Sequence, residues 1–420
     1  MKQYDRRYFL TSLGAFPFLP SILSAQALRE GRHPRALILL WMDGGMSHLD
    51  TLDCKPEAPP DIRGDLGIIE SSVEGVFVSE HWPRIAKMMK HCSVVRSLTS
   101  PEGNHDRGSH FMLTGRRPST VLTYPSVGSV LGKLGELVTD NPIPPYIAIP
   151  EAHQYARQGF LPVANAPFEL LGDPSKPTFK VKDLQPAPGM RRALDLLKRI
   201  DEIDGHPRSE SEAARDQFLS QARYLSLSPE VRALFDLKEE KPDLRKRYGR
   251  HFFGQACLLA RRLVEGGVGT VLVRYKGWDH HQGINRALTH GFPPKLPALD
   301  TAISALHEDL DRRGLLDRVL VLLASEFGRT PRLNPAGGRD HWSRASSTLL
   351  FGAGIKQGVA AGQTDARGEE PDGYAVSPKD LYATVLHALG ADTEASLTTP
   401  DGRPIRVVDE DAEPVQRILA

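Results

Sequence analysis

The most informative segment of the chain reads Arg35-Ala36-Leu37-Ile38-Leu39-Leu40-Trp41-Met42-Asp43-Gly44-Gly45. Its apolar residues are continuous rather than alternating, which indicates a strand that is covered on both faces. Strands of this kind are typical of the middle of a parallel sheet. The run stops at an aspartate and two glycines, where a turn is expected. We therefore predict a buried parallel strand that places Asp43 at the edge of a sheet.

The rest of the chain alternates between apolar runs of this kind and helical patterns. The runs lie at residues 93–95, 146–149, 268–273, 319–323 and 347–351. Apolar residues at helical spacing lie between them, at 85–89, 252–263 and 299–310. This alternation predicts an α/β fold with a mainly parallel sheet and helices on both faces.

Two segments depart from the alternation. The charged region near 182–248 has helical stretches but no strong strand, so we expect a helical insertion there. Residues 362–373 are polar and rich in glycine, which predicts a surface loop.

The composition limits the classes of partner. The 420 residues are 40% hydrophobic and 25% charged, as expected for a globular protein. With 53 Lys and Arg against 52 Asp and Glu, the formal net charge is +1, and no basic stripe suggests nucleic-acid binding. The three cysteines, Cys54, Cys92 and Cys257, are odd in number and far apart, which favours neither a disulfide scaffold nor a cysteine zinc site.

The N-terminus has the pattern of an export signal. Arg6-Arg7-Tyr8-Phe9-Leu10 begins an uncharged run over residues 9–23, and Ala25-Gln26-Ala27 fits a cleavage site. We predict a twin-arginine signal peptide at 1–27, recognised by the twin-arginine export machinery, and a single mature domain at 28–420 in the periplasm or outside the cell. The alternative is an N-terminal arm that carries two arginines by chance. Glycine and prolines interrupt the run, and we expect no membrane span in the mature chain.

Ionisable residues gather directly after the predicted strands. The groups lie at 43–53, 104–110, 277–281, 325–330 and 338–342. Ligands of open parallel sheets bind at the carboxyl ends of the strands, where such groups meet. Carboxylates and imidazoles suit zinc and, where oxygen predominates, calcium, manganese or magnesium. We therefore predict one or two divalent metal ions, which could polarise an ester oxygen or acidify bound water.

Each group also has a purely structural explanation. Asp43 could cap a turn, and His48 and Asp50 could hydrogen-bond to loop backbone. Asn104 or Asp106 could cap a helix. The joint placement of these groups after separate strands favours the shared metal site.

The motifs resemble those of the domain of unknown function 1501 family, which comprises exported bacterial proteins of the alkaline phosphatase–sulfatase superfamily. The matching segments are the leader and residues 44–53, 55–56, 62–64, 105–115, 277–281, 326–331, 338–342 and 402–404. The resemblance covers nearly the whole mature chain. It implies a three-layer α/β/α sandwich with a central, mostly parallel sheet. It also implies hydrolysis of phosphate or sulfate esters by an activated Ser, Thr or modified Cys with one or two divalent cations.

The resemblance also implies roles for individual residues. It points to metal ligands at Asp43, Asp279, His281, Glu326 and His341. We add the neighbouring Asp340 to this set. His105 falls where sulfatases carry their nucleophile, so it could be a ligand, a nucleophile or a base that acts on metal-bound water. Arg107, Arg329 and Arg339 flank the site, where guanidinium groups could bind a phosphate or sulfate or neutralise carboxylates.

Two classes of function follow. The first is an exported metal-dependent hydrolase of sulfate or phosphate esters, with a small-molecule or glycan substrate, His105 at the reacting centre and Arg329 or Arg339 orienting the anion. The second is an exported binding or surface protein with a degenerate site. Glu326-Phe327-Gly328 in place of the superfamily's Asp-His-Gly favours it, as does the lack of a clear nucleophile; the nearby hydroxyls belong to Thr99, Ser100 and Ser109. A third possibility is the transfer of a phosphoryl group, which would need the same metals.

Overall fold

The computed structural model describes residues 35–135, 143–181 and 228–420, together with residues 184, 189, 192 and 196. The predicted signal peptide lies outside the described residues, as does most of the predicted insertion at 182–248. Its last part, residues 228–248, forms helices α8 (Pro229–Phe235) and α9 (Pro242–Tyr248), with the 3-10 turn η4 (Leu237–Glu239) between them.

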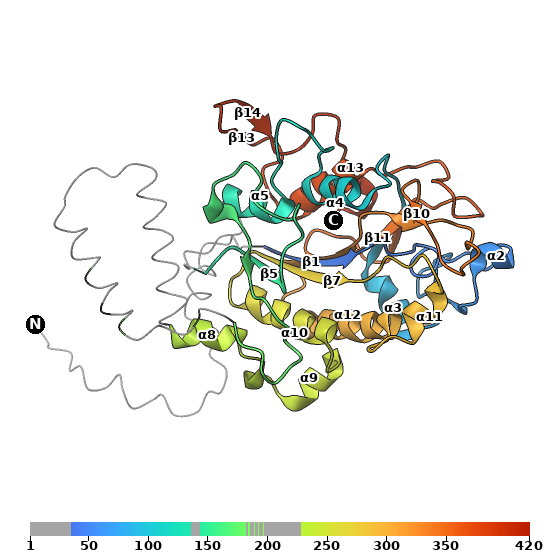
Figure 1. Ribbon diagram of the computed structural model, residues 1–420, viewed down its shortest axis with the longest axis horizontal. Coiled ribbons are helices and arrows are strands. Elements are labelled where there is room, and N and C mark those ends of the chain that lie inside the picture. Colours follow the sequence, from blue (N-terminus) through green and yellow to red (C-terminus); the bar gives the residue numbers. More distant parts are fainter. Residues whose placement is uncertain are drawn as a thin grey trace, which may run out of the picture. The chain divides into compact units, whose positions relative to one another are not determined.

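An eight-stranded sheet lies at the centre of the fold, with the order β12-β4-β11-β8-β1-β7-β5-β6 (Figure 1). Its strands are β1 (Ala36–Asp43), β4 (Ser93–Leu98), β5 (Tyr146–Ile149), β6 (Phe168–Glu169), β7 (Thr270–Lys276), β8 (Val319–Ala324), β11 (Ser346–Gly352) and β12 (Val359–Ala361). Neighbouring strands are parallel except at β11, which is antiparallel to both β4 and β8. The predicted mostly parallel sheet is confirmed.

Strand β1 shows why its sequence is continuously apolar. It pairs with β7 on one side and with β8 on the other, so it is an inner strand. Ile38 and Leu40 belong to the core on one face of the sheet, whereas Leu39 and Trp41 belong to the core on the other. Alternate side chains therefore enter different cores, and every position has to be apolar.

Helices cover both faces and complete the three-layer α/β/α sandwich. Helices α3 (Pro83–Met88), α10 (Phe252–Glu265) and α12 (Lys295–Arg312) pack on one face. Helices α4 (His105–Thr114), α5 (Val127–Leu134) and α13 (Pro378–Ala388) pack on the other, as Figure 1 shows. The three helices predicted from apolar spacing correspond to α3, α10 and α12. The predicted fold class is thus confirmed.

Short elements connect the layers. They are α2 (Pro60–Arg63), α11 (Ile284–Thr289), η2 (Met89–His91), η3 (Val163–Asn165), η5 (Gln416–Ile418), and the strand pairs β2 (Ile68–Glu70) with β3 (Phe77–Ser79), β9 (Gly328–Arg329) with β10 (His341–Trp342), and β13 (Ser396–Thr398) with β14 (Pro404–Arg406). In the described part of the chain, no helix combines the length and the apolar character that a membrane crossing requires.

The predicted surface loop at 362–373 folds back onto the segment after β1. The carbonyl of Gly368 lies 2.9 Å from His48 Nε2, and the hydroxyl of the buried Thr364 donates to the carboxylate of Asp53. The hydrogen bond of His48 to backbone is the structural role considered for it above. The loop therefore holds this segment in place instead of projecting freely.

Candidate metal site

Several polar segments converge at the carboxyl ends of the central strands. Asp43 is the last residue of β1, and it lies opposite Lys276 at the end of β7. Asp279 follows β7, and Glu326 follows β8. The short β9–β10 pair places His341 opposite Arg329. The predicted convergence after separate strands is therefore present in the structure.

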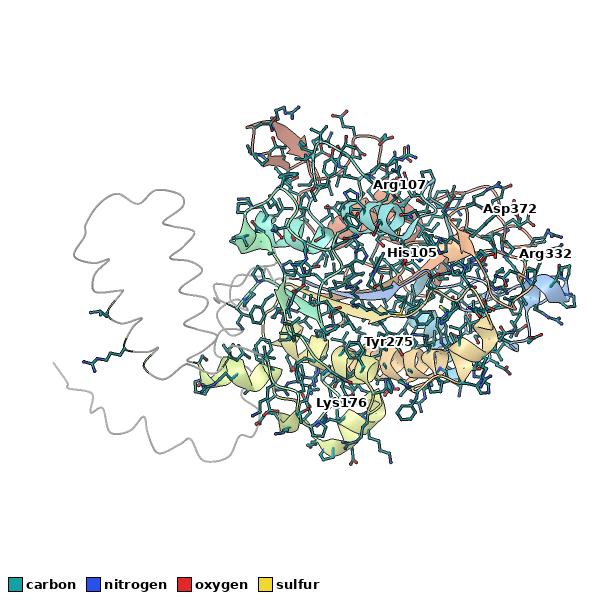
Figure 2. All side chains as sticks on the ribbon, viewed as in Figure 1. His105, Arg107, Lys176, Tyr275, Arg332 and Asp372 are labelled. Atoms are coloured by element: carbon teal, nitrogen blue, oxygen red, sulfur yellow. The ribbon has the colours of Figure 1, made fainter. Side chains whose placement is uncertain are left out.

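His105 comes from a helix that covers one face of the sheet. It is the first residue of α4, and Figure 2 shows it between this helix and the sheet. The side chain of Asn104 caps the helix by accepting hydrogen bonds from the backbone N–H groups of Asp106 and Arg107. The cap fixes where the helix begins, so it also fixes where the His105 ring is presented.

A carboxylate and three imidazoles face one another at this edge. Ligand atoms of His105, Asp279 and His341 all lie within 4.8 Å of one another. His281 Nε2 lies 2.9 Å from Asp279 Oδ1 and 3.1 Å from His341 Nε2. Two further separations are 3.3 Å, from Asp279 Oδ1 to His341 Nε2 and from Asp279 Oδ2 to His105 Nε2.

The other nitrogen of each imidazole is held by an oxygen. His105 Nδ1 lies 2.7 Å from Glu326 Oε1, and His281 Nδ1 lies 2.6 Å from Asp340 Oδ1. His341 Nδ1 lies 3.2 Å from the carbonyl oxygen of Gly103. An acceptor at Nδ1 places the ring proton there and leaves the Nε2 lone pair free for a ligand. All three lone pairs are then directed toward Asp279.

This arrangement fits a divalent cation. With the protons on Nδ1, the Nε2 atoms of His281 and His341 face each other as two acceptors at 3.1 Å, which is repulsive without a positive charge between them. His105 Nε2 is buried and has no hydrogen-bond partner. Zinc–nitrogen bonds of about 2.0–2.1 Å put tetrahedral ligand atoms about 3.3 Å apart, close to the separations seen here. The donor set therefore suits a bound metal ion.

Two predicted metal ligands lie behind the histidines. The carboxyl of Glu326 is 1% exposed, and it accepts hydrogen bonds from the Gly44 N–H at 2.9 Å and the Ser325 hydroxyl at 2.9 Å, besides its contact with His105. Asp340 contacts the Nδ1 side of His281 in the same way. Both carboxylates are placed to orient imidazoles.

The charges around Asp279 keep it ionised. Burial opposes ionisation, but the hydrogen bond and positive charge of Arg329, 2.5 Å away, outweigh it and lower the pKa of Asp279 below its usual range. The hydrogen bond to Glu326 raises the pKa of His105, whereas burial lowers the pKa of His341. An ionised carboxylate beside a neutral His341 is the state that binds metal.

The predicted anion-binding arginines all form contacts within the protein, Arg329 and Arg339 as buried side chains and Arg107 as an exposed one. Arg329 donates to the backbone carbonyls of Gly44 and Gly45 as well as to Asp279. Arg339 forms an ion pair with Asp50 at 2.7 Å, in which neither side chain is exposed. Arg107, on the outer side of α4 in Figure 2, pairs with Glu102 at 2.6 Å. Their contact with a substrate anion stays a prediction.

Asp43 is not among the residues whose ligand atoms lie within 4.8 Å of one another, and it forms an ion pair that the sequence did not predict. Arg274 donates to its Oδ2 through Nε at 2.7 Å and Nη2 at 2.6 Å. His153 Nε2 lies 4.0 Å from Asp43 Oδ1. The rule that located the other groups also applies to His153, because it follows the strand at 146–149. Arg274 lies within β7, where the apolar pattern gave no such signal.

The chain is similar to several solved structures at low sequence identity. Among solved structures, the chain is similar to the PsFucS1 sulfatase from Pseudoalteromonas sp., with 13% identity, a TM-score of 0.34 and coverage of 88% of this chain and 70% of that one. It is also similar to a protein in the alkaline phosphatase superfamily from Vibrio parahaemolyticus, with 11% identity, a TM-score of 0.39 and coverage of 86% and 68%. A third is the phosphonate monoester hydrolase SpPMH from Silicibacter pomeroyi, with 13% identity, a TM-score of 0.32 and coverage of 91% and 76%.

The search of curated proteins gave no match. The model of one family, described as protein of unknown function (DUF1501), matches residues 34–419. This match spans most of the 420 residues and confirms the family predicted from the motifs. The chain therefore belongs to the DUF1501 family of proteins of unknown function.

Proposed function

We propose that this chain is an exported, divalent-metal-dependent hydrolase of phosphate or sulfate esters. One observation carries the proposal: three imidazoles, each held at Nδ1 by an oxygen, direct Nε2 toward the carboxylate of Asp279. Burying or crowding ionisable groups costs free energy unless a ligand compensates for it, and such groups concentrate at functional sites. The side chains of Asp279 and His281 are 44% and 42% exposed, so a dissolved ester can reach the site.

We propose Asp279, His281 and His341 as the ligands of the ion. Two imidazoles and one carboxylate leave a position open and favour zinc or manganese over calcium. When bound, the ion would supply Lewis acidity and lower the pKa of a water molecule. Arg329 keeps Asp279 ionised and in place. Glu326 and Asp340 hold the rings of His105 and His281 in the orientation that the site requires.

His105 is proposed as the residue at the reacting centre. Its Nδ1 is held by Glu326, and its Nε2 is free of hydrogen bonds, so Nε2 can accept a proton from the attacking group or return one to the leaving oxygen. This role predicts that His105→Ala retains metal and loses turnover. Equal loss of metal in His105→Ala and His341→Ala would instead make His105 a ligand.

Asp43 is proposed as the carboxylate of a second ion, with His153 as its neighbour. Hydrolases with two ions use one near the attacking oxygen and one near the leaving oxygen. Metal analysis tests this assignment directly. The purified protein should contain two equivalents of ion, and Asp43→Asn should contain one. The same stoichiometry in both proteins would remove Asp43 from the metal site.

Elemental analysis of the folded protein is the decisive test of the proposal. We expect zinc or manganese in the purified chain and the loss of one equivalent in His341→Ala and in His281→Ala. His387→Ala is the matched control, because His387 is an exposed imidazole on α13, outside the site. Unchanged metal content in both site variants would overturn the proposal.

The alternative, an exported binding or surface protein, is favoured by one observation. In the described part of the chain, the residue directed at the cluster from the start of α4 is His105 rather than a hydroxyl or thiol. A panel of aryl sulfates and aryl phosphates, assayed with zinc, manganese, magnesium and calcium, separates the two functions. Turnover that disappears in His105→Ala supports the hydrolase. A metal-loaded protein without turnover on any substrate supports the binding protein.

A further inference from the structure

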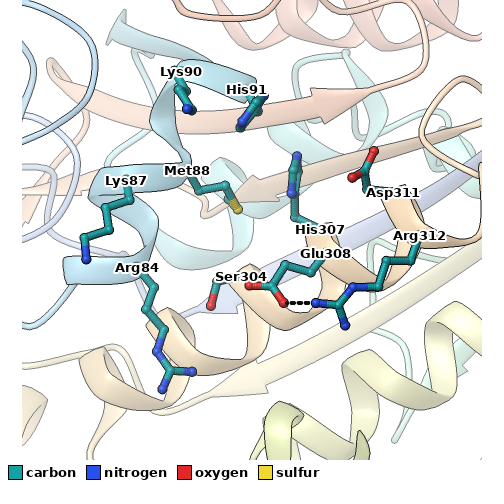
Figure 3. A pocket seen from close by; sticks show the side chains of 10 residues that line it. All are labelled: Arg84, Lys87, Met88, Lys90, His91, Ser304, His307, Glu308, Asp311 and Arg312. Carbon is teal, nitrogen blue, oxygen red and sulfur yellow. Dashed lines mark hydrogen bonds and ion pairs between the residues drawn. The ribbon is translucent and has the colours of Figure 1, made fainter.

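A groove lies at the opposite edge of the sheet from the metal site. It has a volume of about 460 Å³ and runs between α3 with its extension η2 and the C-terminal half of α12 (Figure 3). Helix α3 and η2 lead into the start of β4, and α12 leads into the start of β8. The groove is therefore near the amino ends of these strands, whereas the metal site is at the carboxyl ends.

The walls of the groove are fixed by the fold. Ser304, His307, Glu308 and Asp311 recur at helical spacing, so they share one face of α12. The carboxylate of Asp300, one turn earlier, accepts hydrogen bonds from the backbone N–H groups at the start of α3, at 2.8 and 2.9 Å. This contact joins the two helices at one end of the groove and keeps it formed.

Cationic side chains predominate along the wall made by α3 and η2. Lys87 and Lys90 are exposed and form no ion pair within the described part of the chain, and Arg84 lies beside them. On α12, Arg312 already pairs with Glu308 at 3.1 Å, which leaves Asp311 as the other acid of the groove. The lining thus has more positive than negative charge, with its free cations on one wall.

Two histidines form the inner end of the groove. The His307 side chain rises from α12 toward His91, and the two ring centroids are 5.3 Å apart (Figure 3). His307 is 8% exposed, its ring also contacts that of Phe351, and the described residues form no hydrogen bond with its ring nitrogens. The Nδ1 of His91 lies 3.3 Å from Gln357 Oε1, so Nε2 is the nitrogen of His91 that is available to a ligand. His307 lines the groove, so a ring nitrogen without a partner in the protein can bind a ligand there.

We propose that this groove binds the oxyanion of a phosphate or sulfate group. Tetrahedral oxyanions accept several hydrogen bonds at once, and both ammonium groups and imidazole N–H groups are suitable donors. Lys87 and Lys90 would hold the charge at the open wall, and His307 and His91 would donate from the inner end. The site is separate from the metal site and does not depend on the proposed hydrolase activity.

Calorimetric titration with inorganic phosphate tests the proposal. The full-length chain is used with His341→Ala as its background and is stripped of metal with a chelator, so that phosphate bound to either proposed ion does not contribute. We expect saturable binding of one phosphate per chain, weakened at least about tenfold by Lys87→Glu with Lys90→Glu. Lys246→Glu with Arg247→Glu, an equal charge change on exposed residues of α9, should alter the affinity by less than about twofold.

Two results would overturn the proposal. One is the absence of saturable phosphate or sulfate binding in the His341→Ala background. The other is equal weakening by both double variants, which would show that net charge alone matters. If the groove variant does not fold, the imidazole NMR signals of His91 and His307 provide the test, because they should shift and saturate with the calorimetric affinity. Tighter binding of glycerol 3-phosphate than of inorganic phosphate would identify an esterified ligand, and the reverse would identify the free anion.

Discussion

At the scale of single residues, the metal site depends on which ring nitrogen each histidine presents. The acceptor on the far side of a ring decides this, because a proton held at Nδ1 leaves Nε2 as the ligand atom. Glu326 and Asp340 provide two of these acceptors, and the backbone of Gly103 provides the third. The carboxylates are therefore as important to the site as the rings they contact.

Asp340→Asn is expected to weaken metal binding by about tenfold without unfolding the protein. The Asp340 side chain is half exposed, so its replacement removes little packing, but the charged acceptor for His281 Nδ1 is lost. Metal affinity by competition with a chelating dye measures the effect. Asp372→Asn, on an exposed carboxylate that contacts Gln363, is the control. Equal affinity in all three proteins would show that Asp340 does not orient the ring.

His48 should make the protein less stable in mild acid. Burial is the main cause that lowers the pKa of His48 from 6.5 to about 4. The unfolded chain therefore takes up a proton on this residue as the pH falls below 6.5, while the folded chain does not, and stability is lost across that interval. Between pH 7 and pH 5 this residue alone is expected to cost about 2 kcal/mol.

Urea unfolding at the two pH values measures this cost. His48→Gln, which can still donate to the Gly368 carbonyl, should lose less stability between pH 7 and pH 5 than the natural chain. His387→Gln, on an exposed position of α13, should lose as much as the natural chain. An unchanged pH dependence in His48→Gln would contradict the assignment.

Gly44 is expected to tolerate no side chain. Its backbone has a φ of +123°, and an added Cβ would lie 2.6 Å from the Asp279 nitrogen. Gly44→Ala should therefore displace the Asp279 segment and lower the metal content as well as the melting temperature. Gly373→Ala is a matched control, because it also has a positive φ, at +83°, but no atom within 4 Å of its Cβ. Full metal content in Gly44→Ala would show that the segment can adapt.

At the scale of elements, a buried ionic network joins α10 to α12. Arg261 is 1% exposed, and it forms ion pairs with Glu240 at 2.5 Å, Glu265 at 2.5 Å and Asp309 at 2.9 Å. Tyr248 donates a hydrogen bond to the same Asp309, at 3.0 Å. Both helices pack on the face of the sheet that contains Ile38 and Leu40, so the network fixes their relative position.

Removing the centre of this network should be strongly destabilising. Arg261→Ala removes the buried cation that links the carboxylates, while Arg262 still pairs with Glu240 and Arg313 with Asp309, so we expect a loss of about 1.5–3 kcal/mol in the free energy of unfolding. Arg312→Ala removes an exposed pair with Glu308 from α12 and should cost about 1 kcal/mol or less. Chemical denaturation gives both values. Similar losses in the two variants would mean that the network adds nothing beyond a surface pair.

The sequence predicted the inner elements better than the edges of the sheet. The runs that became β1, β7 and β8 are buried on both faces, so their apolar residues are continuous. The reversed direction of β11 was not predicted, because such a run reads the same whichever way the strand points. Short strands such as β6 and β12 were also missed, since two or three residues give too little pattern.

For the proposed metal site, the sequence indicated which residues gather but not how their side chains contact one another. The rule that ligands gather after parallel strands led to Asp279, His281 and His341, and it would also have led to His153. It did not show that Glu326 and Asp340 contact Nδ1 atoms. The direction of a ring is set by tertiary contacts between segments far apart in the chain, such as the 221 positions between His105 and Glu326.

At the scale of the whole molecule, substitution of the twin-arginine pair tests whether the chain is exported. Arg6→Lys with Arg7→Lys keeps the charge of the leader, so only recognition by the export machinery should be lost. We expect the variant to accumulate in the cytoplasm and the natural chain to reach the periplasm or the medium. Cell fractionation followed by immunoblotting measures the distribution. Equal export of both chains would contradict the twin-arginine assignment.

The proposed ligands come from separate segments, and no short stretch of the chain contains them all. Asp279 and His341, for example, are 62 positions apart. An unfolded polypeptide therefore has no cage in which to trap an ion, and loading has to follow folding. A chain that folds before translocation would draw on the intracellular pool of metals, whereas one that folds afterwards would take whatever its surroundings supply. The order of folding and translocation would thus decide which ion the proposed site holds.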